Sequence, residues 1–262
     1  MLQLLRIEWL KNKRYTTFWV LTGLFALLLP LFNYQFSSGM SEEGRMFNLG
    51  YEFPNVWSIF GFWASWFVLF IAFVIIILIS NEYRYRTNRQ NVIDGWTRMQ
   101  MFHAKCQLVV SLALMTTLYV GLWCILFGAA YSKGFDSMTQ GMEKLIYFFV
   151  LCLNYYGFAA MLAFLLKRSG LAIGIFMLYA LIFENILNNY LNWQFKETYI
   201  GTYLPLQSSD ELLPFETVKQ LMSIVRPASS SQPEAWVYVL VSTVYIVLYY
   251  FITKTRLRKS DW

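Results

Sequence analysis

Long apolar intervals without a charged residue dominate the chain. Five of them cover residues 15–41, 53–81, 106–132, 145–166 and 235–253. A membrane-spanning helix needs about 20 largely apolar residues to cross a hydrocarbon core of about 30 Å. None of the five alternates apolar and polar residues as a half-buried strand does. Each interval therefore predicts one transmembrane helix.

A sixth interval, 169–183, is short by itself but continues through Glu184 to Tyr190. We interpret it as a span with one acid inside; a re-entrant or core helix is the alternative for a stretch of this length. The predicted fold is an all-α integral membrane protein, with residues 1–262 forming a single transmembrane domain. Its six spans lie at about 15–36, 57–80, 106–131, 145–166, 170–190 and 235–253.

Composition supports this class. Hydrophobic residues make up 58% of the chain and charged residues only 14%, whereas soluble globular domains carry about 25% charged residues. The excess apolar surface requires membrane lipids as its neighbours. Ten Trp and eighteen Tyr fit the enrichment of these residues at the two membrane interfaces.

The basic residues predict the orientation. Of the 21 Lys and Arg residues, fifteen lie in segment 1–14, loop 81–105, the short connection after the fourth span and the C-terminal tail. Cytoplasmic segments carry the excess of Lys and Arg, so both termini and loop 81–105 are predicted to be cytoplasmic, in a bacterial inner membrane. The longest outer loop is then 191–233. The bases are scattered over short segments with no domain to organise them, which argues against nucleic acid as a partner.

The chain offers little catalytic chemistry. Its one histidine, His103, cannot form a histidine cluster, and the three cysteines have no C-x-x-C spacing. No phosphate-binding loop of the G-x-x-x-x-G-K-[ST] type occurs. We therefore expect no catalytic site, metal site or cofactor in this chain, and no ATP hydrolysis by it.

Loop 81–105 carries more than a positive-inside anchor requires. Asp94-Gly95 is a turn signal, and Thr97 can cap a second short helix that carries Met101, Phe102 and Lys105. Aromatic residues alternate with five bases, and Glu82 stands at the membrane edge. A docking surface with exposed Trp96, Met101 and Phe102 is therefore favoured over a simple anchor.

This loop resembles the intracellular loop of ABC-2 type permeases, the membrane subunits of ATP-binding cassette exporters. In that family the loop forms a coupling helix that inserts into the ATPase subunit. Thr97 stands where Ser is common in the family. The resemblance implies a separate ABC ATPase that carries ATP and magnesium, and a second permease chain in a homo- or heterodimer. It assigns ATPase coupling to Glu82, Arg86, Arg89, Asp94, Gly95, Trp96, Thr97, Arg98, Phe102 and Lys105.

Two flanking helices agree with the resemblance. Leu2, Leu5 and Trp9 recur at helical spacing in segment 1–14, which predicts an interfacial helix. A short outer helix is predicted in the stretch between Pro214 and Pro227. Ordinary packing against the bundle is the alternative role for both.

Glu184 is the intramembrane residue that needs an explanation. An ionisable group at that depth usually faces a cavity or a partner. Asn185 and Asn188 extend a polar patch from it, and Asn154 lies in the fourth span. The patch either lines the exit of a substrate pathway or holds helices together by hydrogen bonds; for Asn154 an interhelical hydrogen bond is favoured.

The sequence thus predicts a permease subunit that moves a substrate across the membrane with ATP hydrolysed elsewhere. Two alternatives stay open. A secondary transporter would use Glu184 to couple an ion gradient, and an integral scaffold would act on an outer partner without a pathway. The substrate is not predicted.

Overall fold

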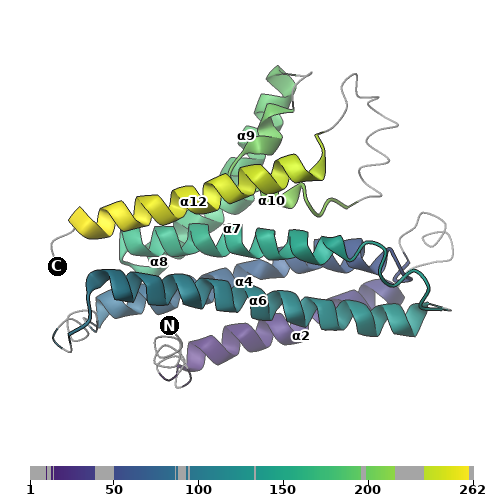
Figure 1. Ribbon diagram of the computed structural model, residues 1–262, viewed down its shortest axis with the longest axis horizontal. Coiled ribbons are helices and arrows are strands. Elements are labelled where there is room, and N and C mark those ends of the chain that lie inside the picture. Colours follow the sequence, from purple (N-terminus) through teal and green to yellow (C-terminus); the bar gives the residue numbers. More distant parts are fainter. Residues whose placement is uncertain are drawn as a thin grey trace.

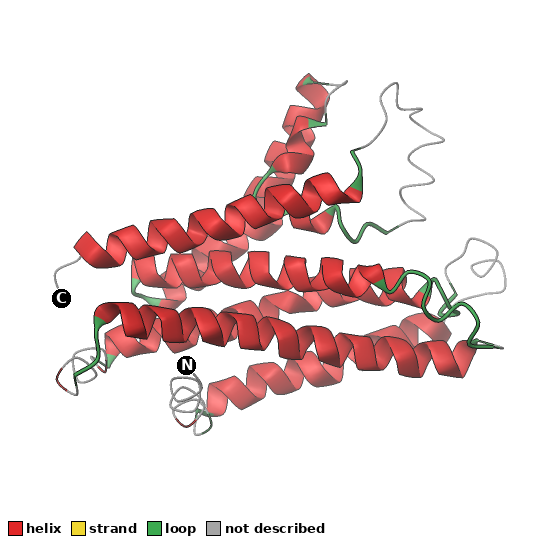
Figure 2. Ribbon diagram, in the orientation of Figure 1, coloured by secondary structure: helices red, strands yellow, loops and turns green. Residues whose placement is uncertain are grey.

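The computed structural model describes residues 10, 13, 15–38, 50–85, 87, 93, 95–132, 134–195, 199–215 and 233–259. These residues form helices joined by turns, and no strand occurs among them (Figure 2). Six helical stretches in the described part are long and apolar enough to cross a membrane. They are α2 (Thr16–Ser38), α4 (Val56–Arg84), α6 (Arg98–Tyr131), α7 (Glu143–Leu166), a composite fifth span and α12 (Ala235–Lys259).

The fifth span has three parts: α8 (Ser169–Met177), the π-helical η1 (Leu178–Phe183) and α9 (Glu184–Gln194). Each of the six predicted spans coincides with one of these helices, so the all-helical, six-span prediction is confirmed. Helices suit the membrane because all their backbone hydrogen bonds are made within the segment.

The core lies where α4 and α7 pack together, with α2, α6, α8 and α12 around them (Figure 1). From α4, Phe60 and Ile75 are fully buried, and from α7, Phe148 and Tyr156. Aromatic rings fill much of the space between helices; Phe60, for example, meets Phe127 of α6 with ring centroids 5.4 Å apart. The bundle is thus held by side-chain packing, as expected where lipid tails are as apolar as the side chains.

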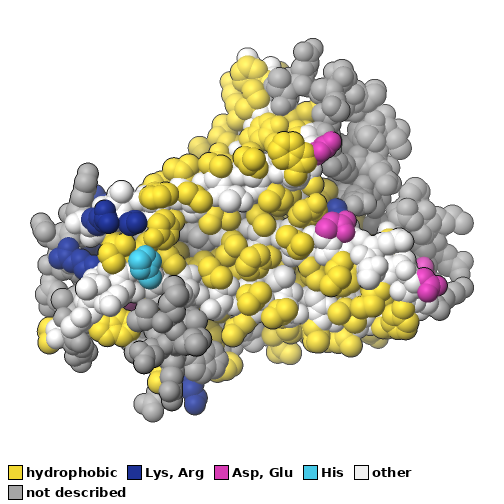
Figure 3. All heavy atoms as spheres, viewed as in Figure 1, with side chains coloured by type: hydrophobic (Ala, Val, Ile, Leu, Met, Phe, Trp, Pro, Cys, Tyr) yellow, Lys and Arg dark blue, Asp and Glu magenta, His cyan; other side chains and the backbone are white. Residues whose placement is uncertain are grey.

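The two ends of the bundle differ in charge. The end of α4, the start of α6, the connection from α7 to α8 and the end of α12 lie at one end of the molecule (Figure 1). Most of the Lys and Arg side chains visible in Figure 3 lie at this end, whereas most of the visible Asp and Glu side chains lie toward the other end. Which end faces the cytoplasm stays a prediction from the sequence.

The helix that carries the third span begins before the predicted span. We expected a span from 106 preceded by a separate short helix, but α6 runs unbroken from Arg98 to Tyr131. Thr97 does cap a helix, and that helix is α6 itself. The Thr97 hydroxyl oxygen accepts a hydrogen bond from the Gln100 N–H, and the Gln100 side-chain oxygen accepts one from the Thr97 N–H. Lys105 lies inside this helix, and its ammonium pairs with Glu82 of α4 at 2.7 Å.

The described parts of the predicted outer loop 191–233 are partly helical. α9 continues to Gln194, and residues 199–215 fold back against the helices, forming η2 (Ile200–Tyr203) and α10 (Gln207–Asp210). In Figure 1, α9 rises away from the direction of the other helices, and α10 lies next to α12. We call residues 199–215 the folded-back segment.

Two predicted helices fall outside the described residues. Of the interfacial helix 1–14 only Leu10 and Lys13 are described, and of the outer helix between Pro214 and Pro227 only its first residues, Pro214 and Phe215. Both stay predictions.

Candidate functional site

Glu184 binds the folded-back segment. Its side chain is 2% exposed, and its Oε1 accepts hydrogen bonds from the backbone N–H groups of Leu206, at 2.6 Å, and Gln207, at 2.9 Å. These two N–H groups lie at the start of α10, where a helix has no backbone acceptors of its own. Oε1 thus joins the fifth span to the folded-back segment, whereas Oε2 is buried with no hydrogen-bond partner among the described residues. Whether the polar patch also lines a substrate pathway stays a prediction.

Asn154 of α7 holds the same segment from a second side. Its amide nitrogen donates to the Pro205 carbonyl oxygen at 2.6 Å and to Ser209 Oγ at 3.0 Å. The bond to Ser209 joins α7 to α10, so Asn154 does make an interhelical hydrogen bond, although its partner is a short helix between the fifth and sixth spans and not another span. Asn154 lies eleven residues into α7, which places it about 17 Å along the helix at 1.5 Å per residue. The folded-back segment therefore reaches about half-way along α7.

The remaining asparagines serve the packing of η2. Asn188 accepts from the Asn192 side chain at 2.6 Å, and Asn192 in turn accepts from the Gly201 N–H at 3.0 Å. Asn185 turns back on its own helix, donating to the carbonyl oxygens of Ala180 and Leu181. Asn185 also borders a cavity, which Asn154 and Asn188 do not.

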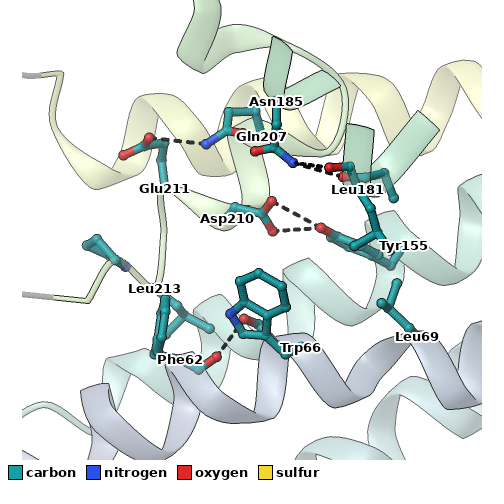
Figure 4. Close-up of a pocket in the computed structure, with 13 residues that line it drawn as sticks. Phe62, Trp66, Leu69, Tyr155, Leu181, Asn185, Gln207, Asp210, Glu211 and Leu213 are labelled. Atoms are coloured by element: carbon teal, nitrogen blue, oxygen red, sulfur yellow. Dashed lines mark hydrogen bonds between the residues drawn. The ribbon is translucent and has the colours of Figure 1, made fainter. Parts of the chain in front are cut away.

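This cavity, about 250 Å³ in volume, lies between α4, α7, the fifth span and the folded-back segment. Figure 4 shows Asp210 in it, with Gln207 and Asn185 on one side and Trp66 on the other. The Tyr155 hydroxyl donates to the Asp210 carboxylate, 2.9 and 3.0 Å from its two oxygens. The cavity is lined by Phe62, Ser65, Trp66, Leu69, Tyr155, Ala180, Leu181, Asn185, Gln207, Asp210, Glu211, Leu213 and Pro214. We call it the outer cavity.

At the basic end of the bundle, the prediction that Met101 and Phe102 are exposed is wrong. They are 8% and 3% exposed. The Phe102 ring packs against Phe164 of α7 and Tyr250 of α12, with centroids 5.9 and 5.1 Å away. The cause is the continuous α6, whose first turns belong to the bundle and not to a separate surface helix.

The exposed part of the predicted docking loop is the connection between α4 and α6. Gly95 has a φ of +91°, which glycine adopts readily, and this agrees with the turn expected at Asp94-Gly95. Trp96 is half-buried, whereas Ile93, which the sequence reasoning did not single out, is 83% exposed. Arg98 is exposed at the start of α6. Three of the coupling residues, Arg86, Arg89 and Asp94, lie outside the described residues.

Glu82 and Lys105 join the helices on either side of this connection. Their side chains are 14% and 4% exposed, and the pair ties the end of α4 to the second turn of α6. A buried pair of this kind fixes the relative position of two elements more than it adds stability. A force applied to the connection would therefore act on both helices together.

The sequence matches the model of the ABC-2 family transporter proteins over residues 4–183. The chain belongs to this family. The match covers the first four spans, the connection between α4 and α6, and α8 with η1. It ends one residue before Glu184, so the folded-back segment and α12 lie beyond it. A comparison with curated proteins gave no match.

The outer cavity is the part of this ABC-2 family protein that sequence reasoning missed. Asp210 and Tyr155 were not candidates, because residues 191–233 were interpreted as a loop outside the membrane. A signal was present: the polar run Gln207-Ser208-Ser209-Asp210-Glu211 stands between Leu204-Pro205-Leu206 and Leu212-Leu213-Pro214. Apolar residues on both sides of a short polar run are typical of a segment buried at its ends.

Proposed function

We propose that the chain is the permease subunit of an ABC exporter in a bacterial cytoplasmic membrane. A separate ABC ATPase would bind ATP and magnesium, and a second permease chain would complete the pathway. The family match carries this proposal, together with six membrane-crossing helices. The connection between α4 and α6 supports it, because an exposed Ile93 beside Trp96 and Arg98 provides an apolar centre with a charged rim.

The second permease chain is supported by the surface of the fifth span. Large apolar side chains point outward along its length, and lipid or another chain must cover them in the membrane. They include Leu171, Ile175, Leu178, Ile182, Phe183 and Ile186. The outer cavity opens beside this surface, where Trp66 is 57% exposed. A second copy or a related chain placed here would enclose the cavity.

A secondary transporter is the weaker candidate. It would need Glu184 to bind and release a coupling ion. Glu184 Oε1 already accepts from two backbone N–H groups of the folded-back segment, which leaves only Oε2 without a partner among the described residues.

Co-purification of the ABC ATPase with variants of the connection tests the proposal. Ile93→Ser and Trp96→Ala should each weaken ATPase binding about 30-fold, or ~2 kcal/mol, if these side chains are interface anchors. Arg98→Glu should mainly slow assembly, because a reversed rim charge acts on encounter.

Phe135→Ser is the matched control. Phe135 is 63% exposed at the opposite end of the bundle, so its loss should leave ATPase binding unchanged. The docking assignment fails if all three connection variants retain the ATPase at the level of the Phe135 control. Phe102→Ala is unsuitable as a docking variant, because removal of a buried ring costs about 3–5 kcal/mol of stability.

A further inference from the structure

The outer cavity holds a carboxylate for which the described part of the chain supplies no cation. Asp210 accepts a hydrogen bond from the Tyr155 hydroxyl. Within the described part of the chain no Lys, Arg or His pairs with it, and none lines the cavity. A carboxylate removed from water is costly unless a cation or several donors compensate it. Asp210 therefore favours a positive charge in the space beside it.

The surroundings add negative charge. Glu211 follows Asp210 and lines the same cavity. Glu184 is also near, because its Oε1 accepts hydrogen bonds from the N–H groups at the start of α10. Tyr155 is the titratable group that faces Asp210 from α7. These acids do not assemble into a metal site: no cluster of three or more His, Cys, Asp or Glu suited to a metal ion occurs among the described residues.

The opposite wall of the cavity is apolar and aromatic. It is formed by Phe62, Trp66 and Leu69 of α4, with Leu181 of η1 and Leu213 of the folded-back segment. The face of an aromatic ring, Trp best of all, attracts a cation held within about 6 Å of its centre. Apolar walls with a few convergent polar groups are the usual lining of a small-molecule site.

We propose that the outer cavity binds small amphipathic organic cations, with the charged nitrogen at Asp210 and the apolar part against Phe62, Trp66 and Leu213. The volume of about 250 Å³ is just below the ~300–1,000 Å³ of typical ligand pockets. It suits a compact amine or one end of a longer one. The proposal rests on the proposed function, in which such cations are the class of cargo.

A pair of isosteric probes separates charge from apolar binding. The full chain is placed in nanodiscs of neutral phosphatidylcholine, and equilibrium binding of radiolabelled 4-phenylbutylamine and 4-phenylbutan-1-ol is measured against empty nanodiscs. The amine is a cation at pH 7 and the alcohol is neutral. The wild-type chain should bind the amine at least tenfold more tightly than the alcohol.

Variants then assign the site. Asp210→Asn should weaken amine binding at least tenfold and leave the alcohol unchanged, whereas Asp210→Glu should retain most of the amine affinity. Trp66→Leu, at an exposed position, should weaken the amine more than the alcohol. Asp136→Asn is the matched control, because it makes the same change on an exposed acid of the loop between α6 and α7 and should change neither affinity.

Equal binding of amine and alcohol by the wild-type chain would overturn the proposal, and so would wild-type amine affinity in Asp210→Asn. Retained Asp210→Glu binding guards against misfolding as the cause of a loss. The binding assay needs no ATPase. If amine binding fails while the ATPase still co-purifies normally, only the proposed class of cargo is rejected, and the exporter proposal stands. If the amine binds as expected but no ABC ATPase co-purifies with the chain, the cation site is retained and the exporter proposal is rejected.

Discussion

Glu184 is an acid inside a span whose carboxylate serves as an acceptor for backbone N–H groups. It accepts hydrogen bonds from the N–H groups at the start of α10, because the first N–H groups of a helix have no acceptor within the helix, and α10 has only four residues. The sequence identified Glu184 as unusual because charge is rare within spans. It did not identify the partner, because Leu206 and Gln207 lie more than 20 residues further along the chain.

Removing the acceptor should destabilise the protein. Glu184→Ala leaves two buried N–H groups unpaired, at ~1–3 kcal/mol each, and should lower the thermal melting temperature of the purified chain by several degrees. Glu184→Gln keeps an oxygen acceptor and should melt close to the wild type. Equal melting of the Ala and Gln variants would show that Oε1 does not hold the segment.

At the scale of elements, the close approach of η2 to α9 depends on Gly201. A Cβ at this position would lie 2.5 Å from the carbonyl oxygen of Asn188 and 2.9 Å from its Cα. No real side chain tolerates such contacts, so a larger residue would push η2 away from α9. The folded-back segment would then lose its contact with the end of the fifth span.

Gly201→Ala should therefore cost about 1–3 kcal/mol, the usual effect of overpacking. Gly174→Ala is the control from the same span, since a Cβ there meets nothing within 4 Å. It should be neutral or stabilise the helix by ~0.5–1 kcal/mol. Thermal unfolding of both variants in one detergent gives the comparison; an unchanged Gly201→Ala midpoint would contradict the packing described here.

The sequence predicted six helices because each span is a long apolar run, a property of local composition. It did not predict that the third helix starts as early as Arg98, because Lys105 looked like a boundary. The charge is tolerated there through Glu82, 23 residues earlier, and only the packing of α4 against α6 brings the two together. For the same reason Met101 and Phe102 were predicted as surface anchors, although they are core residues.

For the whole molecule, the basic residues and the outer cavity lie toward different ends. The basic end carries the connection between α4 and α6, and the opposite half contains the outer cavity and the folded-back segment. Under the proposed function, the motion of the ATPase would enter at the basic end. Glu82 and Lys105, which join α4 to α6, would pass it to α4, whose residues Phe62 and Trp66 line the cavity. Local patterns predict the spans and the loop, and they mark residues 207–211 as unusual. The cavity itself depends on contacts between distant segments, which no local pattern specifies.

Site-specific photo-crosslinking tests the central claim most directly. A photoreactive amino acid is placed at Ile93, in the connection between α4 and α6. The control position is Phe135, which is also exposed but lies at the opposite end of the bundle. The chain is co-expressed with its ABC ATPase and irradiated in intact cells. The account predicts a crosslink to the ATPase from Ile93 and none from Phe135. A crosslink from Phe135, or none from Ile93 in a complex that still co-purifies, would contradict it.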